Sequence, residues 1–254
     1  MHSLFHSRDN DAVQPVEPVP TVFPPIQGAD IAALFVGKRI AGDFYDSIRV
    51  SPERVLIGLL DMAGRREDNR KLLTTAQSTF RTVGTQLFSG QDINEADAMT
   101  ELCLHLNRGL IEGAEKVLSC PALIACYHEK FGTLCYANAG HTPALLRDDS
   151  GIAELGSTGL PLGLFSHATA EARIVGLERG ALLLLVSKGV VACEGRYNRS
   201  LEEFGLDRVK GLLEKAQPAG ATDLCDSVLR GVADFSEGAP ACDDRTALAL
   251  IRTA

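Results

Sequence analysis

The stretch Val55-Leu-Ile-Gly-Leu-Leu-Asp-Met-Ala-Gly64 carries an apolar run directly into an aspartate, Asp61. Two further motifs place an acid at the end of a short segment: Asp43 in Ala41-Gly-Asp-Phe-Tyr-Asp46 and Asp243 in Cys242-Asp-Asp-Arg-Thr246. Carboxylates that converge from separate strands at one sheet edge repel each other unless divalent cations or an ammonium neutralise them. The sequence therefore predicts a functional site built on these three aspartates.

Apolar runs of strand length follow one another from about residue 30 onward. Several show little polar alternation, which is typical of a strand that is covered on both faces. The runs are Ile31–Val36, Val55–Leu60, Ala122–Tyr127, Ala144–Leu146, Ala181–Val186 and Ala247–Ile251.

Apolar residues that recur three or four positions apart predict two long helices, one through Leu72–Leu87 and one through Leu102–Ala114. A third helix is expected to begin at Ser200, with Glu203 completing a capping box, and a fourth at Thr222. The order is strands, a helix pair, strands, a helix pair and a last strand. This order favours two stacked sheets with helices on the outer faces over a doubly wound sheet.

The length of 254 residues and the hydrophobic content of 45% suit one catalytic-size domain. Residues 1–27 are rich in proline and are expected to form an extended lead-in, and residues 28–254 to form the domain. The balance of 25 basic and 33 acidic residues, a net charge of -8, argues against nucleic acid and anionic membranes as partners. Proteins or small ions are the expected partners.

The seven cysteines are scattered and contain no Cys-x-x-Cys pair, so neither a disulfide framework nor a thiolate metal site is expected. No apolar run approaches the roughly 18 residues that span a bilayer, and no apolar stretch follows the first positive residues as in a signal peptide. These observations predict a cytoplasmic protein.

Six segments in order resemble the PPM (metal-dependent, type 2C) protein serine/threonine phosphatases, in particular their SpoIIE- and RsbU-like bacterial branch. The resemblance extends over about residues 28–252. It implies a four-layer α-β-β-α sandwich of the α+β class, with two mainly antiparallel sheets flanked by helix pairs. The matching segments are Gly42–Asp46, Leu60–Gly64, Tyr136–Leu146, Gly159–Leu164, Phe204–Leu206 and Asp243–Thr246.

The resemblance also implies an activity, which is hydrolysis of phosphoserine or phosphothreonine with two Mn²⁺ or Mg²⁺ ions. Asp61 would bridge the ions, the carbonyl of Met62 would bind one of them, Asp43 would hold metal-bound waters and Asp243 would bind the second ion. In this branch the usual substrates are small phosphorylated anti-anti-sigma proteins. The alternative is that these aspartates only cap strands or form turns.

One residue departs from the family pattern, because Lys188 in Ser187-Lys-Gly189 stands where the family has a metal-binding aspartate. An ammonium about 4 Å from a carboxylate is worth on the order of 4 kcal/mol at an effective dielectric near 20. If Lys188 points inward, it replaces the ion held by Asp243, leaves one metal or none, and favours a catalytically weak or dead pseudophosphatase that binds phosphoproteins. If its stem carries the ammonium to solvent, the acids remain free to bind metal.

Other polar residues near the motifs are weaker candidates. Arg65 and Arg66 would bind a substrate phosphate or form a solvated face. Asp46 and Asp244 would orient the ligands as hydrogen-bond acceptors or would be exposed neighbours without a role. His141 is expected to pack at a turn rather than to act as an acid. By analogy with the family, the two long helices between residues 68 and 117 would act as a switch that a partner repositions.

Overall fold

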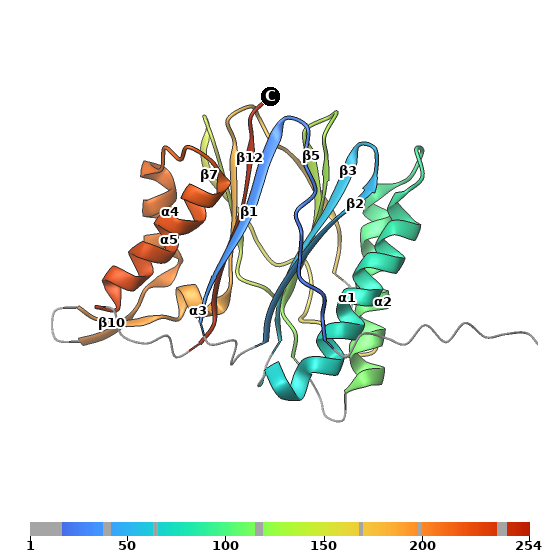
Figure 1. The fold of residues 1–254 in the computed structure, drawn as a ribbon, viewed down its shortest axis with the longest axis horizontal. Helices are drawn as coiled ribbons and strands as arrows, with labels where there is room; N and C mark the ends of the chain where they lie inside the picture. Colours follow the sequence, from blue (N-terminus) through green and yellow to red (C-terminus); the bar gives the residue numbers. More distant parts are fainter. Residues whose placement is uncertain are drawn as a thin grey trace, which may run out of the picture.

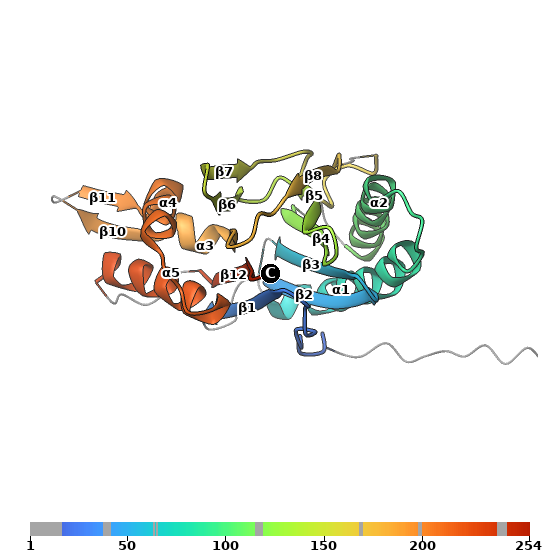
Figure 2. The ribbon, with the colours of Figure 1, turned by 90° about the horizontal axis from the view of Figure 1, so that it is seen from above.

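The computed structural model describes residues 17–37, 42–62, 64, 66–114, 119–167, 170–197, 200–237 and 243–254. Within these residues, two five-stranded sheets stack face to face and helices cover both outer faces (Figure 1). Seen from above, the four layers follow one another as helices, sheet, sheet and helices (Figure 2). The predicted α+β sandwich is confirmed.

All named strand pairs are antiparallel, and the two sheets have the strand orders β1-β12-β9-β6-β7 and β2-β3-β4-β5-β8. The first sheet consists of β1 (Ala29–Val36), β12 (Arg245–Arg252), β9 (Leu182–Val186), β6 (Ala144–Asp148) and β7 (Gly151–Leu155). The second consists of β2 (Gly42–Ser51), β3 (Arg54–Met62), β4 (Ala122–His128), β5 (Thr133–Ala139) and β8 (Arg173–Gly176). A separate hairpin is formed by β10 (Glu194–Tyr197) and β11 (Ser200–Glu203).

The helices form two pairs. Helices α1 (Arg66–Phe88) and α2 (Glu95–Gly113) cover the second sheet, and α4 (Gly205–Lys215) and α5 (Ala221–Phe235) cover the first. The one-turn helix α3 (Lys188–Val191) directly follows β9. The hydrophobic core accordingly divides into three clusters, one beneath each helix pair and one between the sheets.

Strand β3 shows why the buried strands lack polar alternation. Leu56 and Leu60 pack beneath α1 and α2, whereas Val55, Ile57 and Leu59 pack between the sheets. Because both faces of the strand are dry between Val55 and Leu60, this stretch contains only apolar residues and one glycine. The strict alternation of side chains also places the odd-numbered residues of β3, and those of its partner β2, on the face toward the first sheet.

The helix expected to begin at Ser200 begins later, at Gly205. Residues Ser200–Glu203 instead pair with β10 as strand β11. The next residue, Phe204, donates its amide to the carbonyl of Cys193 at 2.7 Å and packs edge-on against Phe235 with a centroid distance of 5.3 Å. The capping-box prediction is wrong because pairing with another strand overrides the local signal.

Candidate metal-dependent active site

The register of β2 and β3 places Asp43 directly opposite Asp61. Both residues are odd-numbered, so both carboxylates lie on the face toward the first sheet, at the end where α3 lies in Figure 1. Asp43 is only 5% exposed, and Asp61 is partly exposed. Two of the three predicted aspartates, from separate strands, therefore lie close together at one end of the sandwich.

The first sheet contributes two hydroxyl groups to this pair. Thr246 Oγ1 donates a hydrogen bond of 2.7 Å to Asp43 Oδ2, and the Ser187 side chain also hydrogen-bonds Asp43. The two hydroxyl residues are fixed to each other, because the Thr246 amide donates to Ser187 Oγ at 3.0 Å and the Ser187 amide donates to the Thr246 carbonyl at 3.0 Å. The site is thus assembled from the adjacent ends of both sheets.

Burial is the main cause that raises the pKa of Asp43 to about 7, and the negative charges of Asp61 and Asp243 raise it further. The hydroxyls of Ser187 and Thr246 oppose this rise because they stabilise the ionised form. The pKa of Asp61 is also raised, first by burial and then by the charge of Asp243. The folded chain therefore concentrates negative charge that a bound cation would relieve.

Lys188 lies beside this pair and offers Asp61 two kinds of contact. Its backbone N–H donates to Asp61 Oδ2 at 3.3 Å, and both this bond and the ammonium charge lower the pKa of Asp61. The Lys188 side chain is nevertheless exposed to solvent. The ammonium thus offsets only part of the rise in the pKa of Asp61 that burial and the charge of Asp243 cause.

Helix α3 is packed tightly against Asp244, the residue that precedes β12. A Cβ atom on Gly189 would lie 2.0 Å from the carbonyl oxygen of Asp244, so this position accommodates only glycine unless the backbone moves. Asp244 is 2% exposed, and its amide donates to Asp243 Oδ1 at 2.8 Å. Asp243 itself is exposed, and its negative charge raises the pKa values of both Asp43 and Asp61.

Gly42 and Met62 are opposite each other in the β2–β3 pair. A Cβ atom on Gly42 would lie 2.1 Å from the carbonyl oxygen of Met62, which is the oxygen that the family resemblance assigns to a metal. Glycine at position 42 therefore fixes the place of this carbonyl, and the requirement explains the glycine before Asp43.

We expect Gly42→Ala to lower the affinity of the site for Mn²⁺ by at least about tenfold and to cost about 1–3 kcal/mol of stability, because the new methyl group must displace the Met62 carbonyl. Titration calorimetry and urea unfolding measure the two effects. Gly156→Ala is the matched control, since nothing lies within 4 Å of its added Cβ. Unchanged Mn²⁺ affinity in a destabilised Gly42→Ala variant would remove Met62 from the set of ligands.

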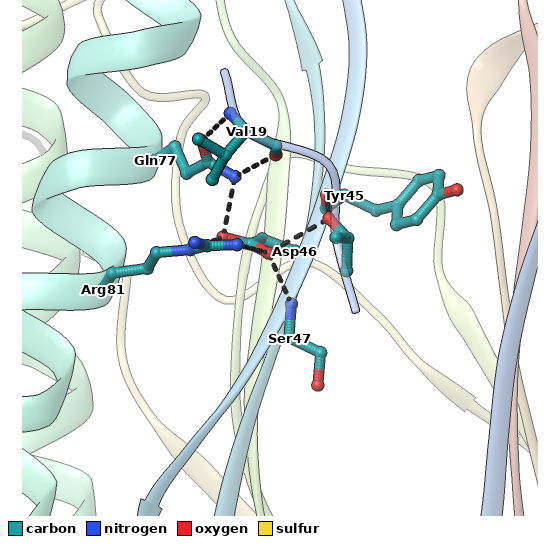
Figure 3. A network of polar contacts seen from close by, with 7 residues as sticks. Val19, Tyr45, Asp46, Ser47, Gln77 and Arg81 are labelled. Atoms are coloured by element: carbon teal, nitrogen blue, oxygen red, sulfur yellow. Dashed lines mark hydrogen bonds and ion pairs between the residues drawn. The ribbon is translucent and has the colours of Figure 1, made fainter. Parts of the chain in front are cut away.

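Two further candidates have partners other than the aspartate pair. Asp46 is even-numbered and faces α1, where Arg81 donates to both of its carboxylate oxygens, at 2.7 and 2.9 Å (Figure 3). His141 is 4% exposed, and its Nδ1 lies 3.0 Å from the Thr142 carbonyl, while burial lowers its pKa to about 4. Both residues are buried, and none of the hydrogen bonds described for them reaches Asp43 or Asp61.

The two arginines after the Asp61 motif give less information. Arg65 lies outside the described residues. Arg66 is the first residue of α1, but the structure does not describe its side chain. Ser187 and Thr246 contact Asp43 but were not predicted from the sequence. Their signal was present in the motifs Ser187-Lys-Gly189 and Asp243-Asp-Arg-Thr246, where each lies next to a predicted site residue.

Carboxylate oxygens are ligands that Mg²⁺ and Mn²⁺ prefer. In the part of the chain that the structure describes, no group of three or more His, Cys, Asp or Glu side chains is arranged so that it could hold a metal ion. Mg²⁺ commonly binds through one or two carboxylates and keeps several waters. The Asp43–Asp61 pair therefore suits such an ion, because it offers oxygen ligands and the two carboxylates that such a site uses.

Known proteins agree with this architecture. The family model for Stage II sporulation protein E (SpoIIE) matches residues 51–253. The chain is 27% identical over 155 residues to the phosphoserine phosphatase RsbP of Bacillus subtilis, a match that covers 61% of this chain and 37% of RsbP. The chain thus belongs to the SpoIIE family of PPM serine/threonine phosphatases, and it matches little more than a third of the length of this relative.

Solved structures share the fold at low sequence identity. The RsbU and RsbW domains of a Mycobacterium tuberculosis protein match with a TM-score of 0.71 and 23% identity, over 94% of this chain and 63% of that one. RsbX, solved in complex with magnesium, matches with a TM-score of 0.63 and 10% identity, over 89% of this chain and 96% of that one.

Among the described residues, no helix is both long and apolar enough to cross a membrane.

Proposed function

We propose that this chain hydrolyses phosphoserine or phosphothreonine in a regulatory partner protein, with Mn²⁺ or Mg²⁺ held at Asp43, Asp61, Asp243 and the Met62 carbonyl. The observation that carries the proposal is the Asp43–Asp61 pair, which is buried enough and repelled enough to raise the pKa of Asp43 to about 7. A cation at this place would remove the repulsion, and the family to which the chain belongs uses such ions for this reaction.

A bound divalent cation supplies a water of lowered pKa and a sink for charge on the phosphoryl oxygens. The residues of this chain orient the oxygen atoms that would bind it. Thr246 and Ser187 donate to Asp43 and thereby favour its ionised form, and the Lys188 amide holds one oxygen of Asp61. Gly42 keeps the Met62 carbonyl at its place opposite β2.

The partner that best fits the proposal is a small phosphorylated protein of the anti-anti-sigma type. The resemblance to the SpoIIE and RsbU branch supports this class of partner, and the net charge of -8 disfavours nucleic acid. The partner itself is to be identified by dephosphorylation of candidate phosphoproteins.

A direct test measures hydrolysis of p-nitrophenyl phosphate and of a phosphoserine peptide by the full chain as Mn²⁺ is added. We expect turnover that rises with Mn²⁺, that EDTA abolishes and that Asp61→Asn removes. Titration calorimetry counts the ions bound. If the wild type binds no Mn²⁺ and hydrolyses neither substrate at any Mn²⁺ concentration, the proposal is wrong.

Lys188 favours a second candidate function, which is a pseudophosphatase that binds a phosphoprotein without hydrolysing it. The ammonium already acts on Asp61, and a lysine cannot lower the pKa of a bound water as a divalent cation does. This candidate predicts that the phosphoserine peptide binds to the wild type in the presence of EDTA and is released unchanged.

A further inference from the structure

A cavity lies at the end of the sandwich opposite to α3 and the aspartates, where three chain reversals meet (Figure 1). They are the β2–β3 turn, the β4–β5 turn and the loop between α1 and α2. Arg54, which lines the cavity, and Asp61 lie near opposite ends of β3, roughly 24 Å apart at the rise of an extended strand. The cavity volume is about 400 Å³. Small-molecule sites commonly measure about 300–1,000 Å³, so this cavity is large enough for a small ligand.

One wall of the cavity is fixed by Arg54. This residue is 7% exposed, and its guanidinium donates to Glu95 Oε1 at 2.6 Å, to the Gly90 carbonyl at 2.8 Å and to the Gln91 carbonyl at 3.2 Å. A single side chain of β3 thereby holds the loop between α1 and α2 in one conformation. Because Glu95 balances the charge of Arg54, other groups of the cavity must recognise a ligand.

His128 is a buried polar residue of the cavity wall whose ring nitrogens lack hydrogen bonds. It is opposite Arg54 in the β3–β4 pair and only 3% exposed. Among the described residues, Nδ1 has no partner, and Nε2 lies 3.7 Å from Glu53 Oε2, which is beyond hydrogen-bond distance. Buried polar groups in folded proteins are nearly always hydrogen-bonded. An imidazole of this kind on a cavity wall therefore indicates a partner that binds there.

Charges of both signs and an aromatic ring surround this imidazole. Lys130 Nζ lies 5.6 Å from the centroid of the Phe131 ring, and neither Lys130 nor Asp92 forms an ion pair within the described part of the chain. The Glu53 side chain is 49% exposed and faces His128. The Phe131 side chain is 63% exposed, and its ring lies 4.4 Å from that of His128 between centroids. The cavity thus offers a cation, an acid and an aromatic face to one ligand.

We propose that this cavity binds a small zwitterion with an apolar or aromatic body, of the class of free α-amino acids. The carboxylate of the ligand accepts hydrogen bonds from Lys130 and from His128 Nε2. Its ammonium donates to Glu53, and its side chain packs on Phe131.

The charges of the cavity select against other small ligands. A ligand with a single charge leaves either Lys130 or Glu53 without a counter-charge. A nucleotide or a sugar phosphate sets two or more negative charges against Glu53 and Asp92. The proposal does not rest on the phosphatase function, because the cavity and the aspartates lie at opposite ends of the sheet.

The first test compares L-phenylalanine with two analogues by titration calorimetry of the full chain in EDTA. Hydrocinnamate lacks the ammonium, and phenylethylamine lacks the carboxylate. We expect L-phenylalanine to bind and each analogue to bind about fivefold more weakly, which is the factor that one exposed ion pair can give. An analogue that binds as tightly as L-phenylalanine would overturn the proposal. So would the absence of binding by L-phenylalanine, L-leucine and L-methionine at millimolar concentration.

Substitutions in the β4–β5 turn locate the ligand. Lys130 and Phe131 are both exposed, so Lys130→Gln and Phe131→Ser should fold normally. We expect each substitution to weaken binding of L-phenylalanine about fivefold. The matched controls Lys215→Gln and Phe165→Ser change exposed residues that do not line the cavity and should leave the affinity unchanged. Wild-type affinity in both Lys130→Gln and Phe131→Ser would show that the ligand binds elsewhere and that the proposal is wrong.

NMR of the histidine ring nitrogens tests the contact with His128 without any substitution in the core. We expect the ring signals of His128 to shift as L-phenylalanine is added. His141 is similarly buried and lies between β5 and β6, so its signals serve as the internal control and should not move. If the His128 signals stay unchanged at saturation with L-phenylalanine, the proposed site is wrong. Because metal and substrate are absent from all three tests, failure of the phosphatase proposal would leave their results unaffected.

Discussion

Lys188→Asp is expected to raise Mn²⁺-dependent hydrolysis of p-nitrophenyl phosphate by at least about tenfold over the wild type, which corresponds to about 1.4 kcal/mol of transition-state stabilisation. The substitution removes an ammonium that acts on Asp61. It also adds a carboxylate at the position that the family resemblance assigns to a metal-binding aspartate. Both changes increase the attraction of the site for a divalent cation. Initial rates over a series of Mn²⁺ concentrations measure the effect.

Two controls separate the new ligand from the lost charge. Lys188→Ala removes the ammonium without adding an oxygen ligand and is expected to give a smaller increase than Lys188→Asp. Lys215→Asp makes the same charge change at an exposed position at the end of α4 and should have no effect. An inert wild type together with an active Lys188→Asp would assign the native chain to the pseudophosphatases. Equal rates for both would show that the ammonium does not compete with metal.

Asp43→Asn is expected to lower Mn²⁺-dependent turnover at least about 100-fold and yet to stabilise the metal-free chain. Because burial and neighbouring carboxylates raise the pKa of Asp43 from 3.8 to about 7, the folded state binds a proton more tightly than the unfolded state does. Stability therefore falls as the pH rises from about 4 to 7, and the full penalty is present above pH 7. The variant lacks this penalty, which is on the order of 2–4 kcal/mol.

Urea unfolding in EDTA at pH 8 and at pH 4.5 tests the sign of this effect. The stability difference between Asp43→Asn and the wild type should be large at pH 8 and small at pH 4.5. Asp46→Asn is the matched control on the same strand, and it should destabilise the chain, because the buried Asp46 carboxylate is paired with Arg81 rather than repelled. A loss of stability in Asp43→Asn at pH 8 would contradict the account of charge repulsion given for the site.

The layers of the fold could be predicted because its signals are local. The apolar run Val55–Leu60 and the stripe Leu72–Leu87 are the inner strand β3 and the helix α1, which packs on the same sheet. Strands β2 and β8 gave no comparable signal. Gly42–Ser51 carries polar residues because Asp43 serves the site and Asp46 serves α1, and Arg173–Gly176 is a mostly exposed edge strand.

Only the residues of the candidate site whose type points to metal binding, the aspartates, could be predicted from the sequence. Asp43 and Asp61 are opposite each other, as acids of one cation site require, and Asp243 lies near enough to raise the pKa values of both. Serine and threonine occur at many positions, so the hydroxyls of Ser187 and Thr246 could be assigned to Asp43 only from the pairing of β9 with β12. Asp46 lies on the opposite face of β2 from Asp43. The sequence motif alone does not show this difference, because it does not say which face of the strand packs against the other sheet.

The tight contact between Gly189 and the Asp244 carbonyl bears on how such a protein diverges. The backbone path after β9 is fixed by position 189, whereas the neighbouring side chain at position 188 projects into solvent. Exchange of an acid for an amine at position 188 therefore leaves the architecture intact. A substitution at position 188 can therefore alter the charge beside Asp61 without opposition from folding.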